Sequence, residues 1–148
     1  MKRKAYETIQ NEDKTVFKFT STGGKGVIVK VVSFYSEGGN TWGLGFGDET
    51  TENEFDDRVI SNNNDIFRVI QTVANTIHDF MEAHPGCNVL IEGVDVKRKA
   101  LYNQVFKRKW EEIRTQFTVF GVSETNIESY DPKKTYGMFV VSKKMGYF

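Results

Sequence analysis

Residues 26–36 (GVIVKVVSFYS) constrain the fold more than any other segment. Apolar side chains occupy both alternating faces of this stretch: Val27, Val29 and Val31 on one, and Ile28, Val32 and Phe34 on the other. Such a strand is usually central and covered on both sides. Flanking strands are predicted at 14–21 and 41–48, joined to it by the glycine-containing turns TGGKG (22–26) and EGGN (37–40). The chain therefore begins as a three-stranded antiparallel sheet.

A helix, a strand and a second helix are predicted next. SNNND (61–65) marks a helix start, because short polar side chains satisfy the free amides of a first turn. An apolar stripe with 3.6-residue spacing follows: Ile66, Val69, Ile70, Val73, Ile77, Phe80 and Met81. HPG (84–86) ends this helix, and CNVLIEG (87–93) is typical of a buried strand. Asp95 can then cap a second helix that extends to about Gln116.

Strands at 117–123 and 135–142 close the chain, and a short strand is predicted at 58–61. Residues 48–57 (DETTENEFDD) carry six acids and no base, which predicts a surface loop. The order β-β-β-(β)-α-β-α-β-β indicates an α+β fold, with a mixed, mostly antiparallel sheet and two main helices. No repeat or proline-rich linker divides the sequence, so residues 1–148 are predicted to form a single domain.

The composition argues against several classes of protein. Twenty lysines and arginines balance twenty acids, whereas a protein that coats polyanions needs a basic excess. A single cysteine, Cys87, excludes an internal disulfide and does not require an oxidising compartment. No apolar run approaches the ~20 residues of a membrane span, and the basic N-terminus lacks the apolar stretch of a secretory signal. We therefore expect a cytoplasmic protein without membrane contact.

The second helix carries the main candidate for a ligand site. Arg98 and Lys109 fall on its apolar arc, where a charged group must find a partner or reach water. Arg98 follows a buried strand, near the carboxyl end at which α/β crossovers place ligands. With Asp95 and Tyr102 nearby, Arg98 could bind a carboxylate or a phosphate. The bare face of Gly43, Gly45 and Gly47 could form the floor of this site.

A purely structural interpretation of the same residues stays open. Arg98 could pair with an acid of its own fold, such as Glu92 or Asp95, while Lys109 extends to solvent. The three glycines could serve turns and close packing.

A second candidate is the basic surface of the same helix. Its cations are Lys97, Lys99, Lys107 and Arg108, and no acid lies between residues 96 and 109. This surface could contact phosphate backbones, or it could be a solvated helix face. The acidic segment 48–57 could complement it within one chain or between chains.

Metal and nucleophile sites are not expected. His78, His84 and Cys87 are too few to supply the three or four converging ligands of zinc, and the sequence does not indicate a Cys–His pair. We predict no metal and no cofactor.

Two resemblances accompany these observations. The segments GLGFGD (43–48), SNN (61–63), TVANTIHDF (72–80) and GVDVKRKALY (93–102) resemble a family of small bacterial proteins of unknown function. The element order, together with ALYNQVFKRKW (100–110), is similar to the core of the GCN5-related acetyltransferase fold. That family binds the pyrophosphate of acetyl-CoA at an Arg/Gln-x-x-Gly-x-Gly/Ala turn, and the matching stretch here, RVISNNNDIF (58–67), has no glycine. No catalytic motif carries over, so acetyl transfer is not expected.

Three functions follow from the sequence. The leading hypothesis is a non-enzymatic bacterial interaction protein, an accessory of a stress, defence or toxin–antitoxin locus that binds a protein partner or itself. The second is a binder or enzyme of a small phosphate- or carboxylate-bearing ligand at Arg98. The third is nucleic-acid binding through residues 97–109.

Overall fold

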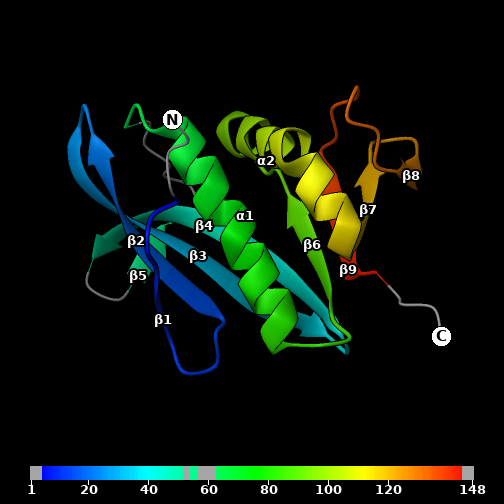
Figure 1. The fold of residues 1–148 in the computed structure, drawn as a ribbon, viewed down its shortest axis with the longest axis horizontal. Helices are drawn as coiled ribbons and strands as arrows, with labels where there is room; N and C mark the ends of the chain where they lie inside the picture. The colour runs from blue at the N-terminus through cyan, green and yellow to red at the C-terminus, as the bar shows by residue number, and fades with distance from the viewer. Residues whose placement is uncertain (1–4, 52–53, 57–62, 145–148) are drawn as a thin grey trace.

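The computed structural model describes residues 5–51, 54–56 and 63–144, and Figure 1 shows its elements. In chain order these are β1 (Ile9–Gln10), β2 (Val16–Gly23), β3 (Gly26–Gly38), β4 (Thr41–Thr51), β5 (Glu54–Asp56), α1 (Ile66–Ala83), β6 (Asn88–Glu92), α2 (Val96–Gln116), β7 (Phe117–Val122), β8 (Ile127–Ser129) and β9 (Met138–Lys143). The α+β class is confirmed.

All described strands join one sheet in the order β1-β2-β3-β4-β6-β9-β7-β8, with β5 paired to β4. Within the described residues β4 and β6 pair in parallel, and the other neighbours are antiparallel. The predicted mixed, mostly antiparallel sheet is therefore confirmed, and so is the TGGKG hairpin, in which Gly23 pairs with Gly26.

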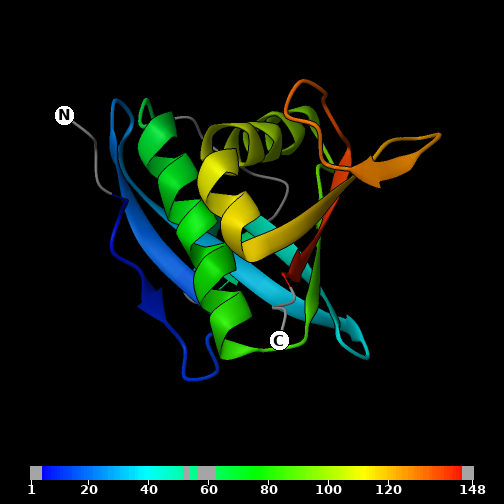
Figure 2. The same ribbon diagram turned by 45° about the vertical axis from the view of Figure 1, so that its right-hand side comes forward.

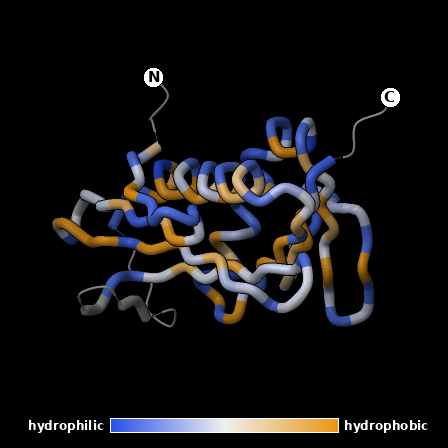
Figure 3. Tube along the Cα trace, turned by 90° about the horizontal axis from the view of Figure 1, so that it is seen from below, coloured by the Kyte–Doolittle hydropathy of each residue, from blue (hydrophilic) through white to orange (hydrophobic). Residues whose placement is uncertain are grey.

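Both helices cover the same face of the sheet (Figures 1 and 2). On α1, Phe80 stacks on Phe34 of β3 with 4.1 Å between the ring centroids. On α2, Phe106 stacks on Phe139 of β9 at 4.4 Å. These side chains belong to one hydrophobic core, and hydrophobic and hydrophilic stretches alternate along the chain that encloses it (Figure 3). The sequence predicts that residues 26–36 are covered on both faces, and this holds only in part: on the face away from the helices Val31 is 2% exposed, whereas Val27 is 71% exposed.

Both helices form where the apolar stripe and the capping residue predicted them. Helix α1 buries the apolar stripe, except that Ile66 is 42% exposed at its first turn. At the start of α2, the side chain of Asp95 accepts a hydrogen bond from the Arg98 amide at 2.8 Å, as a cap should. No helix within the described ranges is long and apolar enough to cross a membrane.

The predicted acidic loop is wrong where the structure describes it. Strand β4 continues to Thr51, and residues 54–56 form β5. Buried Asp48 pairs with Lys30 at 2.7 Å, and Glu49 pairs with Lys18 at 2.6 Å. Lys30 lies on the neighbouring strand β3, and Lys18 lies on β2, one strand further from β4. Because these cations compensate the acids, a strongly acidic segment can continue the sheet. The strand predicted at 58–61 lies outside the described residues.

Candidate ligand pocket

The parallel strands β4 and β6 separate toward their carboxyl ends. Their pairing covers Thr41–Gly43 against Asn88–Leu90, whereas β4 runs on to Thr51. The helices α1 and α2 begin beyond these two ends. In open α/β sheets, ligands bind in the crevice outside the carboxyl ends of the parallel strands, and the pair β4 and β6 has such an end here.

Arg98 supports the separated edge of β4. Its Nε donates to the Phe46 carbonyl at 2.7 Å, and its Nη1 forms an ion pair with Asp95. The residue is 2% exposed, and Nη2 has no hydrogen-bond partner among the described residues. The guanidinium therefore satisfies a strand carbonyl beyond the last pairing of β4 with β6. This geometry corresponds to the structural interpretation, in which Arg98 pairs with Asp95.

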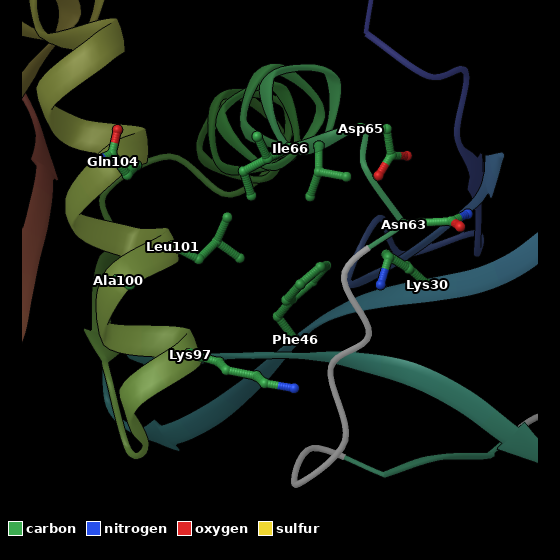
Figure 4. A pocket seen from close by; sticks show the side chains of 10 residues that line it. Lys30, Phe46, Asn63, Asp65, Ile66, Lys97, Ala100, Leu101 and Gln104 are labelled. Atoms are coloured by element: carbon green, nitrogen blue, oxygen red, sulfur yellow. The ribbon is translucent and has the colours of Figure 1, made fainter. Parts of the chain in front are cut away.

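A pocket of about 280 Å³ lies beside Arg98, between the first turns of α1, the N-terminal half of α2 and strands β3 and β4 (Figure 4). Its apolar lining comes from Phe46, Ile66, Val69, Ala100 and Leu101. Its polar lining comes from Lys30, Asn63, Asp65, Lys97 and Gln104. An apolar wall with a few polar groups is typical of small-molecule sites, whose volumes usually start at roughly 300 Å³.

Asp65 is the acid of the pocket. It occupies the N-cap position of α1, but its side chain makes no capping hydrogen bond. Instead its Oδ2 accepts from the hydroxyls of Tyr6 at 2.5 Å and Ser21 at 2.6 Å. Asp65 is 6% exposed, and its carboxylate points from the start of α1 toward Asn63 and Lys30 (Figure 4). The carboxylate is thus fixed in the pocket wall, and α1 has no side-chain cap.

Two lysines contribute to the pocket from different elements. Lys30, on β3, is 1% exposed and pairs with Asp48, its cross-strand neighbour on β4. Lys97, in the first turn of α2, is exposed, and in Figure 4 its ammonium lies below Phe46, whereas Lys30 lies to the right of Phe46. Lys30 is therefore the buried lysine of the pocket lining, and Lys97 is the exposed one.

Asn63 ties the pocket to the β2–β3 hairpin. Its side-chain amide donates to the Gly26 carbonyl at 2.9 Å and accepts from the Lys25 amide at 2.6 Å. Its own carbonyl accepts from the Gly24 amide at 3.2 Å. A Cβ on Gly23 would lie 1.8 Å from that carbonyl oxygen, so glycine is required for this approach. The hairpin thereby holds the segment before α1 in place.

The three glycines of β4 do not meet Arg98 in one site. Leu44 and Phe46 face the helices, so Gly43, Gly45 and Gly47 face the other side of the sheet. A Cβ on Gly43 would lie 2.5 Å from the Tyr35 ring, which shows that an aromatic side chain packs there.

The other predicted residues of α2 are dispersed around the helix. Tyr102 is 1% exposed and belongs to the core. Lys109 donates to Gln71 of α1 and lies 3.5 Å from Glu112. Of the predicted basic surface, Lys97 lines the pocket, while Lys99, Lys107 and Arg108 are exposed elsewhere on the helix. The Arg108 guanidinium lies 4.4 Å from the centroid of the Phe67 ring.

A metal site finds no support in the described ranges, which contain no group of three or more potential ligands. His84 contacts the Phe80 carbonyl at 3.0 Å and stacks on the Phe80 ring. Cys87 is buried beside Met81, and burial raises the pKa of its thiol, which disfavours the reactive thiolate.

Sequence reasoning missed Lys30, Asn63 and Asp65 as pocket residues and Asp48 as the partner of Lys30. One available signal was a lysine within the apolar strand GVIVKVVSF, because such a position requires a buried partner. No local pattern indicates that Asp65 bonds to Tyr6 and Ser21, since these residues are 59 and 44 positions away.

The fold and the pocket define a two-layer α+β protein with a cavity at the carboxyl ends of two parallel strands. The chain belongs to a family of unknown function (DUF6934), which matches residues 2–144. The resemblance to a family of small proteins of unknown function is thereby confirmed. No curated protein and no solved structure matches the chain significantly. The acetyltransferase resemblance stays a prediction.

Proposed function

We propose that this protein binds a small molecule carrying an anionic group, with the apolar part of the molecule in the pocket and the anion at Lys97. The observation that carries the proposal is the pocket itself, in which five apolar side chains lie beside an ammonium group. Its volume of about 280 Å³ limits the enclosed part of the ligand to a small molecule or to one end of a larger one.

The cations near the exposed edge of the pocket favour binding of an anionic group. Lys97 lies in the first turn of α2 and is exposed, so its ammonium group is at the surface of the pocket lining. Arg108 donates to Gln104 at 2.8 Å, which places a second cation next to a lining residue.

This proposal keeps the small phosphate- or carboxylate-bearing ligand that the sequence suggested, but it places the anionic group at Lys97 and not at Arg98. Arg98 supports β4 and does not line the pocket, whereas Lys97 does. Binding to a protein partner or to a second copy has less support, because two acids of the segment 48–57 already form ion pairs within the chain. Nucleic-acid binding, a bacterial cytoplasmic location and the absence of catalysis stay predictions from the sequence.

The test uses hexanoate and hexyl phosphate as probes and hexanol as the uncharged comparison. We expect both anions to perturb the backbone NMR signals of Ala100, Leu101 and Gln104, and hexanol to bind more weakly. Lys97→Gln should weaken binding of the anions about fivefold to tenfold, as expected for a partly solvated charge contact. Lys99→Gln is the matched control, because Lys99 is exposed on the same helix but does not line the pocket.

A second variant tests the location. Ala100→Trp should block the pocket while the chain stays folded, because Ala100 is exposed on α2. Ala83→Trp, at an exposed position at the end of α1, should leave binding unchanged. Anion binding that survives Ala100→Trp and Lys97→Gln would overturn the proposal.

A further inference from the structure

The inner wall of the pocket presents a carboxylate oxygen that the fold leaves open. Oδ2 of Asp65 accepts both hydroxyl hydrogen bonds, from Tyr6 and from Ser21. Oδ1 accepts no hydrogen bond within the part of the chain that the structure describes, and it makes no cap to α1. Asp65 is one of the residues that line the pocket, and it is only 6% exposed.

A buried carboxylate is costly unless it is compensated. Two neutral hydroxyls compensate Asp65 in part, and they fix its orientation as well. As the N-cap residue, Asp65 could have bonded to the amides of α1, a bond worth about 1 kcal/mol. The fold forgoes that bond and directs the carboxylate into the pocket wall.

Three charged residues of the described chain line the pocket: Lys30, Asp65 and Lys97. Lys30 forms a buried ion pair with Asp48 at 2.7 Å, whereas Asp65 is held by two neutral hydroxyls. Lys97 provides a positive charge on another side of the pocket (Figure 4). The pocket therefore has an inner acid, an apolar middle and a cation near solvent.

We infer, building on the proposed ligand site, that the ligand is zwitterionic: an ammonium group binds Asp65 Oδ1, and the anionic group binds Lys97. Small amino acids and ω-amino acids are the matching chemical class. An ammonium group supplies the charged donors that Oδ1 lacks, and hydrogen bonds between charged groups are about twice as strong as neutral ones.

The test compares ω-amino acids from 4-aminobutyrate to 8-aminooctanoate with the fatty acids of equal length that lack the amine. The series brackets the span between Asp65 and Lys97. At the best length we expect the amino acid to bind about tenfold more tightly than its amine-free partner. Asp65→Asn should remove this ratio and leave the fatty-acid affinity within about twofold.

Control variants keep the result interpretable. Glu111→Gln changes an exposed acid on α2 and should leave the ratio intact. Ser21→Ala keeps the charge of Asp65 but removes one orienting hydroxyl, so it should reduce the ratio without abolishing it. If Asp65→Asn fails to fold, Ser21→Ala still tests the inference.

The outcomes separate this inference from the proposal beneath it. Equal affinity of both members of every pair, with both depending on Lys97, would overturn the zwitterion and support the anion site. A preference for the amine that persists in Asp65→Asn would also overturn the inference. Failure of every probe to bind would overturn the proposed function, and the inference with it.

Discussion

The carboxylate of Asp65 accepts a hydrogen bond from the Ser21 hydroxyl at 2.6 Å, although Asp65 occupies the N-cap position of α1. This contact joins β2 to the start of the helix and fixes the orientation of a buried charge. It also determines which carboxylate oxygen is available to the pocket.

Ser21→Ala is expected to lower the free energy of unfolding by about 1.5–3 kcal/mol, because a hydrogen bond to a buried charge is lost. Urea unfolding measures this loss. In an Asp65→Asn background the same substitution should cost less, since the acceptor is no longer charged. Equal costs in the two backgrounds would contradict the coupling of Ser21 to the charge.

Arg98→Met should destabilise the protein by about 2–3 kcal/mol. It removes a buried guanidinium from the core and leaves the Phe46 carbonyl without its donor, while the partner Asp95 is 39% exposed. Arg98→Lys should recover little, because a single ammonium cannot reproduce a planar guanidinium that bonds through two nitrogens. Denaturant unfolding checks both variants. A cost below 1 kcal/mol for Arg98→Met would show that Arg98 does not support β4.

Gly23→Ala and Gly26→Ala form a matched pair in one hairpin. A Cβ at Gly23 would collide with the Asn63 carbonyl oxygen at 1.8 Å. The hydrogen bonds that join Asn63 to the β2–β3 hairpin must therefore lengthen or break. Gly26 has a φ of +88° and open space around it, so its substitution costs only backbone strain, about 1 kcal/mol. Gly23→Ala should therefore be the more destabilising variant in thermal unfolding and should also weaken probe binding. Equal losses of stability would contradict the role of the Gly23–Asn63 approach in holding the segment before α1.

Stability should fall as the pH rises from about 10 to about 12. Burial raises the pKa of both Tyr130 and Tyr136 from 10 to about 12, and for Tyr136 the hydrogen bond to Glu128 adds to this shift. The unfolded chain loses these protons first, so the stabilisation is complete below pH 10 and is lost as the pH approaches 12. Melting temperatures measured between pH 9 and 11.5 test this. The double variant Tyr130→Phe/Tyr136→Phe should show a shallower decline, and an unchanged slope would exclude these tyrosines as its source.

Much of the fold could be predicted from local patterns. The stripe from Val69 to Met81 predicted α1, and Asp95 caps α2 as expected, because periodicity and capping depend on residues close in sequence. The separation of β4 from β6, which creates the pocket, could not be predicted this way. It depends on where pairing stops between strands more than forty residues apart.

In the candidate site, too, contacts between residues close in sequence could be predicted, and contacts between distant residues could not. Arg98 was recognised as a charged residue facing the core, and the two partners proposed for it included Asp95, three residues away. The Lys30–Asp48 and Ser21–Asp65 contacts depend on strand register and on the docking of α1, neither of which a local pattern contains. Residues 48–51 were mistaken for a loop because acids usually avoid strands when no cation lies opposite them.

The most direct test of the central claim is a crystal structure of the protein with the ω-amino acid that binds best. The account predicts density in the pocket, with the carboxylate beside Lys97, the ammonium within hydrogen-bond distance of Asp65 Oδ1, and the alkyl chain against Phe46 and Leu101. A probe found outside the pocket, with the pocket empty and binding unaffected by Ala100→Trp, would contradict it.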